Sequence, residues 1–286
     1  MKRIVRLTQV VAAAVVVFLT SSCRSVIFED RFVCPKFLYF DVTNAEGFNH
    51  FETVYVTAFT HPDWRLYDKD TTHLALMTPD PEAFHFSIRS SNGVRGYGVL
   101  GLSNCVIEGD SELVIPIGKE SDPLFHFVYE SPVEEESFVV PVEFVKDYSR
   151  VTIQFEGMET FVSADGQFPF NVLLTSNTRG IDAMTGLPLE GRFETYPKEL
   201  SIGRFVFNLP RQFDHSLRME LYGKPGVYDR YGLIDTFDLW RKLRDEGGIT
   251  WQEKNLPDVE LTINYQEMSV SVSVSPWQEE YVQYEY

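Results

Sequence analysis

The sequence predicts an all-β protein with two tandem antiparallel β-sandwich domains and one short helix in the second domain. From Cys34 onward, apolar and polar residues alternate with a period of two, as in strands that bury one face. The alternating segments are short and recur about every ten residues, and polar turn clusters such as SSNG and EGDSE separate them. A helical pattern occurs at one place only. Together these features favour packed sheets over an α/β arrangement.

The first domain is expected to cover residues 34–147. Its strands are expected at residues 37–42, 53–59, 74–77, 83–88, 96–102, 112–117, 124–129 and 138–145. Residues 146–149 (KDYS) interrupt the apolar alternation before a second series of strands begins, so the sequence places the domain boundary there.

The second domain is expected to cover residues 148–286 and to end in an arm. Its strands are expected at residues 151–155, 171–175, 201–208, 216–222 and 259–265. A helix is expected at residues 236–243, because Thr236 or Asp235 can cap its start and two glycines follow its end. The apolar face of this helix consists of Phe237, Trp240 and Leu243.

The last twenty residues fall into two different segments. Residues 267–275 (EMSVSVSVS) alternate valine with serine, which predicts an outer strand with one face in water. Residues 277–286 would present apolar groups on both faces of an extended chain, namely Trp277, Tyr281, Val282, Tyr284 and Tyr286. This tail is expected to be covered on both sides, either by a neighbouring protein to which it adds as a strand or by its own domain.

The N-terminus has the layout of a lipoprotein signal peptide. Lys2, Arg3 and Arg6 precede an apolar run of about ten residues, which is too short to span a bilayer. Small residues then lead to Cys23, at the position where bacterial lipoproteins carry the lipidated cysteine. We expect cleavage after residue 22, lipidation of Cys23 with acyl chains such as palmitate, and a linker at residues 23–33. An ordinary signal peptide with a chance cysteine is the alternative.

The charge of the mature chain limits its partners. Cleavage leaves a net charge near −20, because the 42 acidic residues all remain while three of the 25 basic ones are lost. Such a surface repels nucleic acid and anionic lipid head groups. Acyl chains, which contribute about 0.8 kcal/mol per buried CH₂, are therefore expected to hold the protein at the outer membrane.

The two remaining cysteines suggest a disulfide. Export places the chain in an oxidising compartment, and lipidation of Cys23 leaves the even pair Cys34 and Cys105. A bridge requires Cα atoms within about 7 Å and would contribute roughly 4 kcal/mol by constraining the unfolded chain. Two separate buried thiols are the alternative.

The sequence contains no motif typical of an enzyme, a metal site or a cofactor site. The glycine-rich stretch at residues 93–98 lies between strands and does not open a helix, so it is not a dinucleotide fingerprint. The histidines are scattered, and those at 85 and 126 lie within strand patterns, where a packed histidine is expected. Asp68 and Asp70 lie in a turn that lacks the other ligands of a calcium loop. We expect no catalysis and no cofactor.

Several segments, in order, resemble the FimB-type fimbrial anchor lipoproteins of Bacteroidetes type V pili. They begin with the lipobox cysteine, the acidic pair Glu29-Asp30 and Cys34-Pro35. VYVTAF, GYGVLGLSN, SRVTIQFEG, GRFVFNLP, LIDTFDLW and LPDVELTINYQEMSVSVSVSPW follow. The resemblance spans nearly the whole mature chain. It implies two tandem transthyretin-like sandwiches and a surface-exposed outer-membrane protein that holds a pilus, with a fimbrial shaft subunit as partner through β-strand addition.

Two points bear on which kind of member of that family this chain resembles. Arg24 directly follows the lipid cysteine, where an acidic stretch is typical of surface export. Shaft and tip subunits share the fold, and shaft pilins lose an N-terminal segment after an arginine. Only ten residues lie between Cys23 and Cys34, which leaves little to remove and favours an anchor that keeps its lipid.

A glycan-binding surface lipoprotein is the main alternative function. It needs exposed aromatic platforms, for which Trp64 with Tyr67, or Tyr228 with Tyr231, are the local pairs. A shaft or tip subunit is the other alternative. A secreted hydrolase has no supporting motif.

Replacement of the lipid cysteine tests the first expectation. The variant Cys23→Ala lacks the thiol that is alkylated before cleavage, so we expect an uncleaved or soluble protein. Membrane fractionation and intact-mass measurement check this. A Cys23→Ala protein that fractionates with the outer membrane like the unmodified chain contradicts the lipid assignment.

Overall fold

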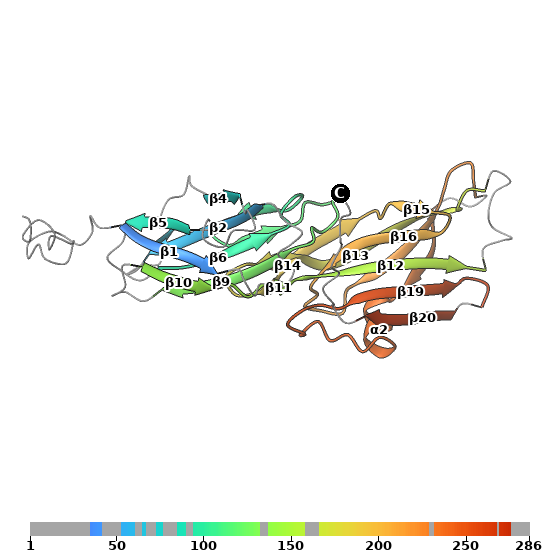
Figure 1. Cartoon of the computed structure of the whole chain (residues 1–286). Coiled ribbons are helices and arrows are strands. Elements are labelled where there is room, and N and C mark those ends of the chain that lie inside the picture. The colour runs from blue at the N-terminus through green and yellow to red at the C-terminus, as the bar shows by residue number, and fades with distance from the viewer. Residues whose placement is uncertain are drawn as a thin grey trace, which may run out of the picture.

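The computed structural model describes residues 35–41, 53–60, 65–66, 73–76, 85–89, 94–131, 137–157, 166–228, 232–267 and 269–275. Figure 1 shows an elongated arrangement in which most strands run along the long axis. We call residues up to 147 the N-terminal half and residues from 148 onward the C-terminal half.

Two sheets face each other in the N-terminal half. The first has the strand order β10-β1-β5, in which β1 and β10 are parallel. The second has the order β11-β9-β6-β2-β3, with β4 also paired to β2. The bounds are β1 Pro35–Asp41, β2 Thr53–Thr60, β3 Arg65–Leu66, β4 His73–Leu76, β5 His85–Arg89, β6 Val94–Leu100, β9 Phe125–Ser131, β10 Ser137–Pro141 and β11 Val145–Lys146.

Two further sheets make up the C-terminal half. One has the order β15-β16-β12-β19-β20, and the other has the order β18-β17-β13-β8-β7, with β14 also paired to β13. The bounds are β7 Val106–Glu108, β8 Glu112–Val114, β12 Tyr148–Glu156, β13 Phe170–Asp182, β14 Leu187–Thr195, β15 Glu199–Ser201, β16 Arg204–Pro210, β17 Arg218–Gly223, β18 Leu233–Phe237, β19 Asp258–Asn264 and β20 Ser269–Ser275.

Alternation decides which side chains form the cores. In β12, Val151, Ile153 and Phe155 are buried while the residues between them face outward. A smaller apolar cluster in the N-terminal half includes Phe40, Val56 and Phe127. The larger cluster fills the C-terminal half, and it also takes in residues of the N-terminal half.

Close packing explains two glycines of β6. A Cβ on Gly98 would lie 2.1 Å from the ring of Phe127, and one on Gly96 would lie 1.8 Å from the carbonyl oxygen of Thr57. Neither position has room for a side chain. These glycines let β6 pass closely beneath the aromatic residues of β9.

The β7–β8 hairpin connects the two halves. The chain leaves the N-terminal sheet at the end of β6, forms the hairpin and returns to that sheet in β9. In between, β8 pairs with Gly180–Asp182 of β13, which belongs to the C-terminal half. The sequence assigns residues 112–117 to the first sandwich, whereas β8 completes a sheet of the second. The division at residue 147 itself stays a prediction.

The single helix in the described part of the chain begins later than the sequence predicts. Residues 233–237 form β18, and α2 runs from Leu239 to Asp245. Asp238 is the N-cap, and its side chain accepts a hydrogen bond from the backbone N–H of Arg241 at 3.0 Å. The expected start at residue 236 is therefore wrong, because Thr236 and Phe237 pair with β17.

The valine–serine segment is an outer strand, as predicted. β20 pairs with β19 along its whole length, from Ser269 opposite Asn264 to Ser275 opposite Asp258. Its serines are exposed, and its valines are half-buried and pack against the large core.

The predicted disulfide is not formed in the structure. Cys105 is a free, buried thiol, and Cys34 lies outside the described residues. Cys105 packs in the larger core cluster, which the two halves share.

The thiol of Cys105 is expected to be unreactive while the protein is folded. Burial raises its pKa to about 12, and the nearby Asp122 carboxylate acts in the same direction. Because the folded pKa exceeds the unfolded one, this group stabilises the fold up to the unfolded pKa, and its contribution falls as pH rises toward about 12.

A thiol assay on residues 24–286 checks this. We expect Cys105 not to react at pH 8 in the native protein, and both cysteines to react after denaturation without reductant. If the denatured, unreduced protein has no free thiol, the cysteines are bridged after all.

Candidate functional site

The residues that the sequence predicts as functional lie mostly outside the described part of the chain. This applies to Cys23, Cys34 and the whole tail at residues 277–286. The lipid site and the subunit contact therefore stay predictions. Trp64, Tyr67 and Tyr231 also lie outside the described residues, whereas Tyr228 packs edge-on against Phe170 with ring centroids 5.1 Å apart.

The described residues contain neither a cluster of metal-ligating side chains nor a membrane-spanning helix. No group of three or more His, Cys, Asp or Glu side chains lies close enough together there to hold an ion. No helix in that part of the chain is long and apolar enough to cross a membrane. Among the described residues, four buried polar side chains, His126, Lys146, Asp147 and Arg211, lie at the junction of the two halves.

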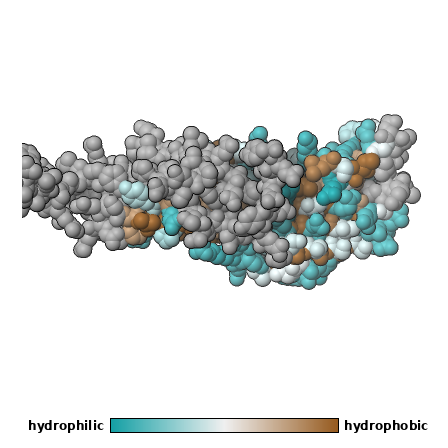
Figure 2. Space-filling view, in the orientation of Figure 1, coloured by the Kyte–Doolittle hydropathy of each residue, from teal (hydrophilic) through white to brown (hydrophobic). Residues whose placement is uncertain are grey.

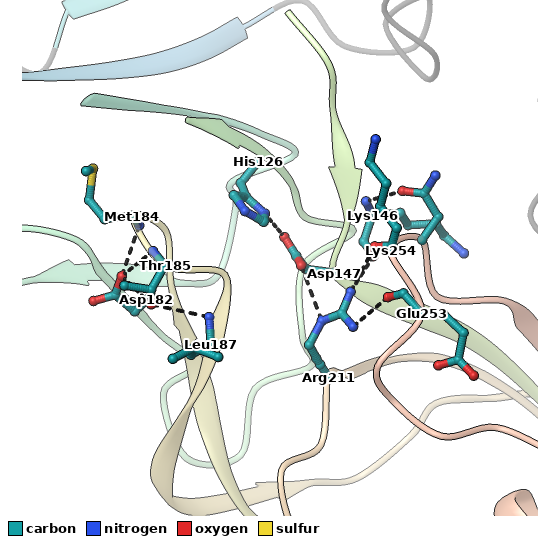
Figure 3. Close-up of polar contacts among 11 residues, drawn as sticks. His126, Lys146, Asp147, Asp182, Met184, Thr185, Leu187, Arg211, Glu253 and Lys254 are labelled. Carbon is teal, nitrogen blue, oxygen red and sulfur yellow. Dashed lines mark hydrogen bonds and ion pairs between the residues drawn. The ribbon is translucent and has the colours of Figure 1, made fainter. Parts of the chain in front are cut away.

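Asp147 is the centre of a buried polar cluster at the junction (Figure 3). Its side chain is 2% exposed. On one side it contacts Nδ1 of His126 from β9, a contact that requires a proton on Nδ1 because a carboxylate only accepts. On the other side, Oδ1 lies 3.5 Å from Nε of Arg211. The carboxylate is thus shared between the two halves.

Arg211 links this carboxylate to the loop before β19. Its guanidinium donates to the carbonyl oxygens of Trp251 and Glu253 at 2.8 Å, and to that of Lys254 at 3.1 Å. The backbone N–H of Arg211 also bonds to the carbonyl of Asp147 at 3.1 Å. A buried guanidinium is stable only when its donors are satisfied, and here backbone carbonyls provide most of the acceptors.

Lys146 adds a second buried charge next to the first. Its ammonium group, 1% exposed, pairs with the carboxylate of Asp258 and donates to the carbonyl of Leu256 at 2.9 Å. Burial lowers the pKa of Lys146, and the contact with Asp258 offsets part of this effect. Lys146, the last residue of β11, is therefore bonded to groups just before and at the start of β19.

Asp122 holds the segment that leads into β7. Its carboxylate accepts backbone N–H groups of Ser103, Asn104 and Cys105 at 2.7–2.8 Å. Asp122 is itself buried, so these bonds replace its lost hydration. They fix the path of the chain from β6 to the hairpin.

Sheet edges and exposed apolar side chains are the surfaces suited to a protein partner. β20 pairs only with β19 among the described strands, so its other edge carries backbone groups without a strand partner in that part of the chain. Figure 2 shows apolar surface over the C-terminal half. Tyr196, Leu200 and Ile202, next to and within the β15–β16 hairpin, are each more than half exposed.

Trp240 is a second aromatic residue to assess as a platform for a sugar. Trp240 on α2 is contacted on its ring by His215, with centroids 3.6 Å apart, and by Arg244, whose guanidinium carbon lies 4.5 Å from the ring centroid. These contacts already engage the ring on which a sugar would stack.

The sequence predicts a packed His126 and a break at residues 146–149, but not the cluster that joins them. Asp147 and Arg211 are 64 positions apart, and Lys146 and Asp258 are separated by 112. No local pattern links residues at such separations.

Comparison with known proteins identifies the fold. No family model matches the chain, and no curated protein matches it. Among solved structures, a candidate polysaccharide-binding protein from Bacteroides thetaiotaomicron is 11% identical with a TM-score of 0.57, covering 86% of this chain and 99% of that one. A candidate adhesin from Bacteroides ovatus is 14% identical with a TM-score of 0.57, covering 85% and 94%.

The fimbrial anchor protein Mfa2 from Porphyromonas gingivalis is also similar. It is 12% identical with a TM-score of 0.53, and the match covers 86% of this chain and 99% of that one. At such identities the similarity establishes the fold. The predicted all-β, two-sandwich fold with one short helix is confirmed.

The junction cluster predicts a specific pattern of stabilities. Arg211→Met leaves the buried Asp147 carboxylate without its main counter-charge, so we expect a loss of about 3–5 kcal/mol in the free energy of unfolding. The double variant Asp147→Asn/Arg211→Met should lose less than the sum of the single variants, because the neutral Asn needs no cation. Urea unfolding measures both. Strict additivity would show that the two residues do not interact.

Proposed function

We propose that this chain is a fimbrial anchor lipoprotein that holds a pilus at the bacterial outer membrane. The observation that carries the proposal is the fold similarity to a fimbrial anchor over almost the full length of that protein. The lipoprotein layout around Cys23 and the ordered segments that resemble the anchor family support it independently. The role is non-enzymatic.

The proposed anchor attaches at two places. Acyl chains on Cys23 hold it in the outer membrane, and residues 24–34 connect the lipid to β1. The tail at residues 277–286 continues from β20, an outer strand of the C-terminal half. The tail would pair as a strand with the fimbrial shaft subunit through backbone hydrogen bonds. Its side chains Trp277, Tyr281, Val282, Tyr284 and Tyr286 would add to the contact.

A surface glycan-binding lipoprotein is the second candidate. It is favoured by the similarity to the candidate polysaccharide-binding protein. The contacts of Tyr228 and Trp240 with neighbouring side chains argue against these two rings as sugar platforms. A glycan array distinguishes the two functions, because an anchor is expected to bind no glycan.

Deletion of residues 277–286 tests the proposed subunit contact. We expect the melting temperature to change little, because the described strands pair without the tail, and we expect pili to detach from the cell. Calorimetry and electron microscopy of pili on cells measure the two effects. A matched control replaces the exposed Val128 of β9, in the N-terminal half, with alanine and should keep pili attached.

Localisation gives the complementary test. Immunogold labelling of a tagged chain should mark the base of purified pili. Labelling along the shaft or at the tip contradicts the anchor role and favours a shaft or tip subunit. A large loss of stability on tail deletion, with pili still attached, would show that the tail belongs to the core.

A further inference from the structure

Backbone pairing joins the two halves of the chain in addition to side-chain contacts. Glu112–Val114 of β8 pairs antiparallel with Gly180–Asp182 of β13. The ladder is extended at both ends, where Ile115 donates to the carbonyl of Arg179 and Ala183 donates to the carbonyl of Ser111, each at 2.8 Å. We call these contacts the β8–β13 ladder.

Each strand of the ladder is held by a different half. β8 lies on an excursion that begins at β6 and ends at β9, two adjacent strands of the N-terminal sheet. β13 is held in the C-terminal half, where Phe170–Thr175 pairs with β17. Figure 1 shows β13 running along the long axis of the molecule, and β8 is antiparallel to it. The ladder is therefore the place where the two halves overlap lengthwise.

Side chains reinforce the ladder on both faces. Leu113, Ile115 and Ile181 are buried in the large core. On the outer side, the guanidinium of Arg179 bridges Glu108 at 3.1 Å and Glu112 at 2.8 Å. These contacts cover the ladder from water on one face and cross-link it on the other.

Gly180 permits the close approach of the two strands. A Cβ at this position would lie 1.9 Å from the carbonyl oxygen of Leu113, and a backbone atom cannot move aside without opening the ladder. Any larger residue at position 180 therefore separates β8 from β13. The substitution Gly180→Ala, which adds one methyl group, therefore weakens the ladder.

We infer that the β8–β13 ladder is a mechanical clamp that keeps the two halves together when the chain is pulled lengthwise. A lengthwise pull drives β8 with the N-terminal half and β13 with the C-terminal half, so the ladder is loaded in shear, in parallel with the peptide link from β11 through Asp147 to β12. All hydrogen bonds of the ladder are then loaded at once, whereas peeling would load them one after another. The use of such a clamp rests on the proposed function, since an anchor transmits load between lipid and pilus.

Single-molecule pulling tests the inference on the isolated protein. Handles are attached to Val139→Cys and Ser201→Cys, two exposed positions on opposite halves, in residues 24–286 with Cys34 replaced by alanine. Cys105 is buried and remains unlabelled. Because the backbone still connects the two handles, opening of the ladder is read as a step in the distance between them, and we expect this step at one force, which we call the separation force.

Gly180→Ala should lower that separation force by about half or more, because the hydrogen bonds of the ladder no longer form. The matched control is Leu261→Ala, a buried residue of β19, which belongs to the sheet that does not contain the ladder. It lowers overall stability but should leave the separation force nearly unchanged. If Gly180→Ala does not fold, the double variant Ser111→Ala/Arg179→Gln removes the bond from Ser111 to Asp182 and the Arg179 bridges instead.

Two outcomes overturn the inference. One is a separation force in the ladder variants equal to that of the unmodified chain. The other is an equal fall of the separation force in Leu261→Ala and Gly180→Ala at matched melting temperatures. The force would then reflect the overall stability of the fold and not the ladder. Neither outcome affects the pilus-localisation test. Failure of that test with the clamp intact would reject the proposed function alone.

Discussion

Strand β13 has to satisfy backbone hydrogen-bonding groups along both of its edges, and it uses partners from both halves of the chain to do so. β14 follows one edge, while the other edge is taken by β17 near the start of β13 and by β8 near its end. This pairing places three demands on the rest of the chain. The β7–β8 hairpin must leave the N-terminal sheet to reach β13, and Asp122 fixes the path of the chain into that hairpin. Position 180 must be glycine, because a Cβ there would meet the carbonyl oxygen of Leu113.

Buried charge at the junction imposes a second condition. Asp147 and Arg211 are both taken out of water, and such a pair is tolerated only when the halves are docked closely enough to satisfy it. Asp147 contacts His126 of β9, whereas Arg211 bonds to carbonyl groups of the loop before β19. The cluster therefore specifies how the two halves are placed relative to each other. Apolar packing alone tolerates small shifts, whereas hydrogen-bonded charges in a dry site do not.

Figure 1 shows an elongated arrangement, in which β1 belongs to the N-terminal half and β20 to the C-terminal half. The β8–β13 ladder and the junction cluster join these two halves. A flexible linker at residues 146–149 would have separated the halves, but Lys146 and Asp147 are instead among the least exposed residues of the chain.

The sequence by itself determined the periodicity of the strands, the outer position of β20 and the existence of one short helix. These follow from local rules: alternation sets a strand's buried face, and capping and turn residues act within a few positions. Tertiary structure decided where β8 pairs, why α2 starts at Leu239 and not at 236, and why Cys105 is a lone buried thiol. It also decided that His126, Asp147 and Arg211 meet. Strand partners and buried ion pairs depend on residues far apart in the chain, and period-two alternation is the same whichever sheet a strand joins.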